Sequence, residues 1–101
     1  MGKALGAELA VNNVPVELNP FVEEFLARTV AGAVSSLKGT ENIRDAELYL
    51  GRGGVNLAVN GSRIPLTPFP KEIITATMTG LVSSLKAVGK IDTVKIVLKA
   101  R

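Results

Sequence analysis

The sequence predicts a single α+β domain made of two copies of a β-β-α-β unit, with six mostly antiparallel strands and two helices. Residues 9–53 match residues 57–101 at 17 of 45 ungapped positions. Each copy combines the apolar alternation of strands with one segment whose apolar residues recur at the helical period. A length of 101 residues suits one domain, so we expect residues 1–101 to share one core.

The identities are spread along the whole repeat. Leu-Ala-Val-Asn at 9–12 recurs at 57–60, and Val-Ser-Ser-Leu-Lys at 34–38 recurs at 82–86. Solenoids and propellers need at least three repeats to bury their faces. Two copies therefore predict a pseudo-twofold domain, which we call a fused pseudo-dimer.

Each copy is predicted to begin with a β-hairpin. In the first copy, apolar alternation over 9–11 leads into a turn at Asn12-Asn13 and resumes over 16–18. The second copy has the stronger turn signal, Asn60-Gly61, because both residue types tolerate the positive φ of tight hairpin turns.

A helix is predicted after each hairpin, over about 20–38 and 68–86. Proline suits the first helical position because its φ is already fixed near the helical value. The preceding residues, Asn19 and Thr67, carry side-chain oxygens that can cap the first free amides.

The first helix has two stripes of different character. The narrow stripe carries Phe25, Thr29, Gly32 and Ser36, matched in the second helix by Ile73, Thr77, Gly80 and Ser84. Glycine inside a helix costs about 1 kcal/mol relative to alanine, so its presence in both copies predicts close approach of another backbone, most simply helix against helix. Inheritance of both glycines without consequence is the alternative. The broad apolar face, which should cover the sheet, comprises Val22, Leu26, Val30, Ala33, Val34 and Leu37.

The third strand of each copy is predicted at 46–50 and at 94–98. Four residues link the first of these to the next strand, too few to cross a sheet, so strands three and four should form an antiparallel hairpin. By symmetry, strand one should pair with strands two and six, which exchanges the last strand of each copy. Pro15 and Pro65 place strands two and five at sheet edges. The expected orders are 5-4-3 and 2-1-6, joined into one mixed sheet or closed into a barrel.

The composition excludes several functional classes. The chain has no Cys and no His, so it lacks thiolates and the usual zinc, copper and haem ligands. No cofactor and no metal site are expected. The apolar runs are far shorter than the roughly 20 residues of a membrane helix, and no secretory signal is recognisable. A cytoplasmic protein without a membrane partner is the expectation.

Two short motifs contain residue types that occur in catalytic or anion-binding sites. Ser-x-x-Lys at 35–38 and 83–86 resembles a nucleophile and base pair, but these pairs close a helix and the partner motifs are missing. Gly-Arg-Gly-Gly at 51–54 could cradle an anion, but it lacks the Lys-Ser/Thr ending of a P-loop, and a flexible hairpin connection is favoured. No catalytic residue is assigned, and the protein is not expected to be an enzyme.

Net charge differs between the two halves. Residues 1–51 hold four basic and seven acidic side chains, whereas residues 52–101 hold eight basic and two acidic, so the net charges are −3 and +6. One interpretation is that the halves attract each other, with Glu47 and Lys95 both on the outward face. The other is a basic face that contacts phosphates or nucleic acid. Its candidate contacts are Arg52, Arg63, Lys71, Lys95 and Lys99.

The function predicted from these observations is a small non-catalytic binding or assembly module, whose partner the sequence does not specify. A homo-oligomer is compatible with such a module. Nucleic-acid or phosphate binding through the basic second copy is the alternative. It is less favoured because one Tyr, no Trp and three Phe at positions predicted to be buried or half-buried offer few surfaces for base stacking.

Overall fold

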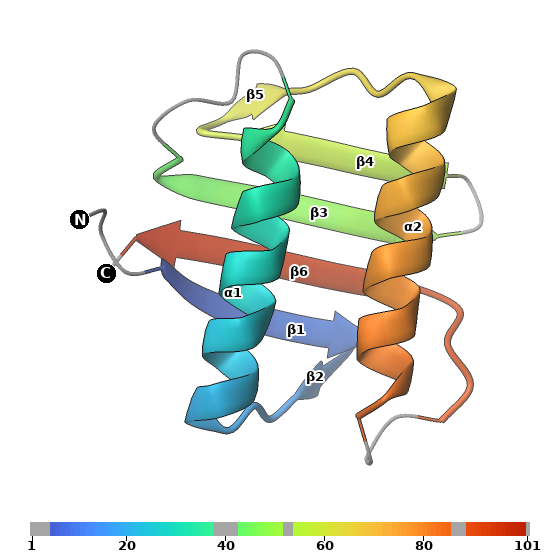
Figure 1. Cartoon of the computed structure of the whole chain (residues 1–101). Coiled ribbons are helices and arrows are strands. Elements are labelled where there is room, and N and C mark those ends of the chain that lie inside the picture. The colour runs from blue at the N-terminus through green and yellow to red at the C-terminus, as the bar shows by residue number, and fades with distance from the viewer. Residues whose placement is uncertain (1–4, 38–42, 52–53, 86–88, 101) are drawn as a thin grey trace.

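The computed structural model describes residues 5–37, 43–51, 54–85 and 89–100. Both helices cover one face of a single sheet and leave the other face open (Figure 1). The α+β class is thereby confirmed. In chain order the elements are β1 (Leu5–Val11), β2 (Val14–Val16), α1 (Pro20–Ser35), β3 (Asp45–Gly51), β4 (Gly54–Val59), β5 (Ser62–Arg63), α2 (Pro68–Ser83) and β6 (Val94–Ala100).

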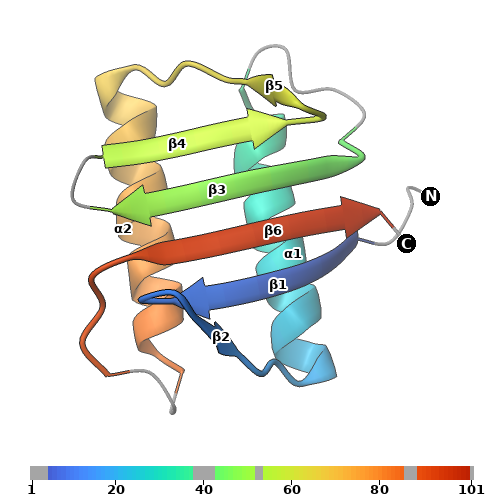
Figure 2. The same ribbon diagram turned by 180° about the vertical axis from the view of Figure 1, so that it is seen from behind.

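The six strands form one open antiparallel sheet in the order β2-β1-β6-β3-β4-β5. The predicted groups 2-1-6 and 5-4-3 join through pairing of β6 with β3, so the strands form one open sheet rather than a barrel (Figure 2). The sheet is antiparallel throughout, so the expectation of a mixed sheet is wrong. The neighbours predicted for β1 and β4 are found. β2, which contains Pro15, and β5, which ends shortly before Pro65, lie at the two edges as expected.

Two helices fit side by side on this sheet because they run across the strands (Figure 1). A helix of 16 residues is about 24 Å long, comparable to the width of six strands spaced about 4.8 Å apart. Seven-residue strands are also about 24 Å long. α1 therefore lies toward one end of the strands and α2 toward the other.

The core fills the space between the sheet and the helices. Leu48 and Ile96 face each other at the centre of the sheet and are 1% and 0% exposed. The predicted apolar face of α1 is confirmed at Leu26, Val30 and Val34, which are buried. The other three predicted members, Val22, Ala33 and Leu37, are half-buried. The helix residues of the core are Leu26, Ala27, Val30 and Val34 of α1, and Ile74, Met78 and Val82 of α2.

The hairpin turns adopt the backbone conformation that their residues predict. Asn12, Asn13 and Asn60 have φ angles of 54°, 67° and 51°, and Gly61 has 84°. Positive φ is tolerated by asparagine and glycine far better than by other residues. Both turn predictions are therefore confirmed.

Asn12 and Asn60 also tie their hairpins to distant segments. Asn12 Oδ1 accepts hydrogen bonds from the backbone amides of residues 92 and 93 at 2.7 and 2.9 Å, and its Nδ2 donates to the Lys90 carbonyl at 2.7 Å. Asn60 Oδ1 likewise accepts from the amides of residues 44 and 45 at 2.7 and 3.1 Å. Each asparagine thus fixes the chain where the third strand of the other half begins.

The helix ends differ in part from the prediction. Asn19 Oδ1 accepts a hydrogen bond from the Val22 amide at 2.8 Å, which confirms its cap, whereas Thr67 makes no side-chain cap bond. Both helices end three residues earlier than predicted. Ser36 and Ser84 donate their hydroxyl protons to carbonyls of their own helices at 2.7 and 2.6 Å, and such local bonds compete with continued helix. The predicted last residue of each helix lies outside the described residues.

Candidate functional site

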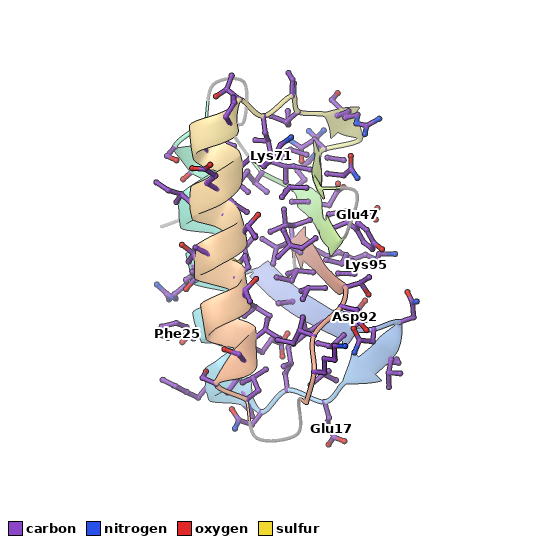
Figure 3. The ribbon with its side chains drawn as sticks, turned by 90° about the vertical axis from the view of Figure 1, so that its right-hand side faces the viewer. Glu17, Phe25, Glu47, Lys71, Asp92 and Lys95 are labelled. Carbon is purple, nitrogen blue, oxygen red and sulfur yellow. The ribbon has the colours of Figure 1, made fainter. Side chains whose placement is uncertain are left out.

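The predicted basic contacts do not gather on one surface. Arg63, Lys95 and Lys99 are exposed on the open face of the sheet. Lys71 lies at the start of α2, in the helix layer, well apart from Lys95 (Figure 3). Arg52 lies outside the described residues. The sequence placed these residues in one half of the chain, but the fold distributes them over two layers.

The open face has mixed charge rather than basic charge. Lys95 Nζ lies 3.9 Å from Glu47 Oε1, and both side chains are more than half exposed, as predicted for this outward-facing pair (Figure 3). Lys99 lies opposite Asp45 in the β6–β3 register. The interpretation of a basic face is corrected here, because β3, from the acidic residues 1–51, pairs with β6, from the basic residues 52–101.

Tyr49 is the aromatic side chain that the described residues present on this face. It is 38% exposed and lies between Lys95 on β6 and Asn56 on β4. Arg63 donates a hydrogen bond to Asn56 Oδ1 next to it. Non-specific binding of single-stranded nucleic acid uses several stacked aromatic rings along a basic groove. A single aromatic ring surrounded by paired charges provides little of the surface that such binding requires.

The predicted helix packing at Gly32 and Gly80 is wrong within the chain. Both glycines are exposed, and a Cβ atom built on either would meet nothing within 4 Å. Ser36 and Ser84 are exposed as well. The reason is that each helix packs on the sheet by its broad apolar face, toward opposite ends of the strands, so the narrow stripe has no neighbour.

Because the space is open, Gly32→Ala and Gly80→Ala are expected to stabilise the fold by about 0.5–1 kcal/mol each, the difference in helix propensity. Urea denaturation of the single variants measures this. Gly61→Ala is the control, since a φ of 84° should make alanine destabilising there. A loss of stability in Gly32→Ala would contradict the open environment.

The helix layer exposes large apolar side chains, and the prediction that the Phe side chains are buried or half-buried is wrong for Phe21 and Phe25. Phe21 and Phe25 of α1 are 73% and 53% exposed, with ring centroids 6.0 Å apart, and Ile73 of α2 is 47% exposed. The sequence could have indicated the exposure of Phe25, because this residue lies on the narrow stripe of the helix rather than on the broad apolar face. Phe25 indeed projects from the helix side of the molecule (Figure 3). Nothing is described for the Phe69 side chain.

The same layer carries few charges. Beyond Arg28 in α1 and beyond Glu72 in α2, the exposed positions up to Leu37 and Leu85 are all uncharged. The outward faces of helices in a two-layer domain are ordinarily charged or polar. The exposed residues of the helix layer over these positions are uncharged and polar or small, apart from the large apolar residue Ile73.

Open pockets formed by the described residues include two at the sides of the sheet. One, of about 550 Å³, lies against β1 and β2 and includes Glu23; the other, of about 390 Å³, lies against β3, β4 and α2 and includes Lys71. Within the described residues no group of three or more acidic side chains could hold a metal ion. Neither described helix is long and apolar enough to cross a membrane. Comparison with protein-family models, with curated proteins and with solved structures yields no match for this chain.

Proposed function

We propose that this chain is a non-catalytic assembly module, a fused pseudo-dimer whose helix layer binds a second copy of the same chain. The exposure of Phe21, Phe25 and Ile73 is the observation that carries the proposal. The ring centroids of Phe21 and Phe25 are 6.0 Å apart, so these two side chains form an exposed apolar patch, a feature that marks interaction sites on soluble domains.

The pairing registers support the description as a fused pseudo-dimer. The centre of the sheet pairs Leu48 with Ile96, two residues related by the 48-residue shift. The hairpin pair Ala10–Pro15 maps by the same shift onto Ala58–Arg63. Asn12 and Asn60 make equivalent bonds to the opposite half. Duplication and fusion of a unit that once paired with itself accounts for all of these relations.

The opposite charges of the halves fit this origin. The Glu47–Lys95 pair lies across the β3–β6 junction and is exposed, so it contributes about 0–1 kcal/mol to stability. The Glu47–Lys95 pair contributes to specificity instead, because opposite charges favour pairing of unlike halves over pairing of like halves. Separately expressed halves should therefore associate with each other more tightly than with themselves, and that preference should weaken at high salt.

Shape complementarity favours a second copy as the partner of the helix layer. Both helices carry bulky apolar residues near their starts and Gly, Ser and Thr near their ends. The helices run in opposite directions, so a bulky end lies beside a small end (Figure 1). A twofold rotation that stacks two helix layers places bulky ends on small ends, which is the self-complementarity of an isologous interface.

The size of the layer is sufficient for a stable dimer. The Cα atoms extend over 34 × 31 Å, with 19 Å in the third direction. The helix layer lies across the broad face (Figure 1). A standard interface needs about 800 Å² per partner, which a face of these dimensions supplies.

Sedimentation equilibrium of the whole chain tests the proposal. Self-association is expected, and Phe25→Glu should weaken it at least tenfold because an exposed anchor becomes a charge facing apolar atoms. Tyr49→Glu is the matched control, since it alters a partly exposed aromatic residue on the open face and should leave association unchanged. A monomer at all concentrations, or equal effects of the two variants, would contradict the proposal.

Phosphate or nucleic-acid binding by the open face remains the second candidate. Arg63, Lys95 and Lys99 favour it, and the interleaved acidic residues oppose it. Binding to heparin or to mixed-sequence DNA that falls steeply with salt would support this candidate. Loss of that binding in Lys95→Glu, with self-association retained, would assign it to the open face.

A further inference from the structure

The outer edge of β1 is closed by a carboxylate from α1. Glu23 Oε2 accepts a hydrogen bond from the Ala7 amide at 3.1 Å, in a partly buried setting. β2 pairs only with residues 9–11, so it does not reach Ala7. The side chain of Glu23 therefore takes the place of a missing strand partner at this point of the edge.

In the second half, β4 has an outer edge equivalent to that of β1, but the helix residue equivalent to Glu23 is different. Val55 stands 48 residues beyond Ala7, and β5 pairs only with residues 58 and 59 of β4, so it does not reach Val55. The Asn60 amide donates to the Asp45 carbonyl, and with the alternation of the β3–β4 ladder this turns the Val55 amide toward the outer edge. Lys71 replaces Glu23 as the fourth residue of the helix. A lysine has no acceptor, so it cannot bind this amide.

Lys71 and Val55 line the same open pocket of about 390 Å³. Figure 3 places Lys71 near the start of α2, on the side of the helix toward the sheet. The Val55 amide, for which no partner is found among the described residues, and the ammonium group of Lys71 offer this pocket two donors, one of them charged. Such a pair is the chemistry that binds a carboxylate. Glu72 also lines the pocket, and its negative charge disfavours a dianion such as phosphate relative to a monoanion.

We propose that Lys71 and the Val55 amide form a carboxylate-binding site at the edge of β4. The ligand is a carboxylate from outside the chain, from a peptide C-terminus or an acidic side chain, and it occupies the position that Glu23 fills internally in the first half. The site lies between β4 and the sheet side of α2, whereas the proposed dimer contact uses the outward side of the helices, so each proposal can fail without the other.

Amide NMR of the whole chain tests the site with acetate as the probe and chloride at equal ionic strength as the reference. The Val55 amide should shift saturably with acetate beyond its response to chloride. The Ala7 amide is the internal control and should not respond, because Glu23 already occupies it. Equal responses of Val55 to acetate and chloride, or a stronger response to phosphate than to acetate, would overturn the proposal.

Two substitutions at Lys71 sharpen the result. Lys71→Met removes the charge and should weaken the acetate response of Val55 roughly tenfold, the order expected for loss of a charge-assisted hydrogen bond. Lys71→Glu should bind the amide internally, so that Val55 gains protection from hydrogen exchange and stops responding to acetate. An unchanged acetate response in both variants would reject the role of Lys71.

Two peptides then identify the source of the carboxylate. One has an amidated C-terminus and a single internal Glu, and the other has a free C-terminus and no acidic side chain. The peptide that shifts Val55 at the lower concentration names the source. Failure of both peptides, with acetate still binding, would overturn the assignment to a peptide partner.

Discussion

Ile96→Ala is expected to lower the free energy of unfolding by about 2–5 kcal/mol, the range for deleting a large aliphatic side chain from a packed core. Ile96 is fully buried on β6, with Leu9 on one neighbouring strand and Leu48 on the other. The cost should fall toward the upper part of the range, because residues between two strands and a helix layer have little freedom to close a cavity.

Urea denaturation measures this loss, and Val97→Ala is the matched control. Val97 is the next residue of the same strand but is half-buried on the open face, so its truncation should cost clearly less. Leu48→Ala should resemble Ile96→Ala. The double variant should depart from additivity, since the two side chains are neighbours across the β3–β6 pairing. Equal losses for Ile96→Ala and Val97→Ala would contradict the described core.

Much of the topology could be predicted because short-range constraints determine it. The link between β3 and β4 is only two residues long, so an antiparallel hairpin is the accessible arrangement. The symmetry of the repeat then predicted that β6 pairs with β1. The alternation of apolar and polar residues along β3 and β6 would be the same in an open sheet, where these two strands pair with each other, and in a closed barrel. The central pairing of Leu48 with Ile96 could therefore be learned only from the structure.

The features of the site were less predictable for a different reason. The stripe through Gly32 and Gly80 indicates a small-residue surface, but a sequence pattern does not show what lies opposite it. The net charges of the two halves predicted a basic face, but the pairing of β3 with β6 places Glu47 beside Lys95. The sequence likewise gives no separate signal for the edge amide of Val55, because its availability depends on where β5 ends.

Asn12→Ala should be the most destabilising substitution outside the core, at about 2–4 kcal/mol. Two effects combine. The variant loses the acceptor for the amides of residues 92 and 93, and each such bond contributes about 0.5–1.5 kcal/mol. It also forces alanine to adopt a φ of 54°, a conformation that costs a residue with a Cβ about 1–2 kcal/mol. Asn60→Ala should behave alike, because it loses the bonds to the amides of residues 44 and 45.

Three further variants separate these two effects in urea denaturation. Asn12→Gly restores the tolerance of positive φ without the acceptor, and Asn12→Asp keeps the acceptor but loses the donor to the Lys90 carbonyl. Asn13→Ala is the matched control for φ alone, because Asn13 has a φ of 67° and no side-chain hydrogen bond with the described residues. Asn12→Ala should therefore cost more than either Asn12→Gly or Asn13→Ala, and it should also raise hydrogen exchange at residues 92 and 93. If Asn12→Ala and Asn13→Ala were equally destabilising, the bonds from Asn12 to the opposite half would contribute nothing, and the junction would depend on strand pairing alone.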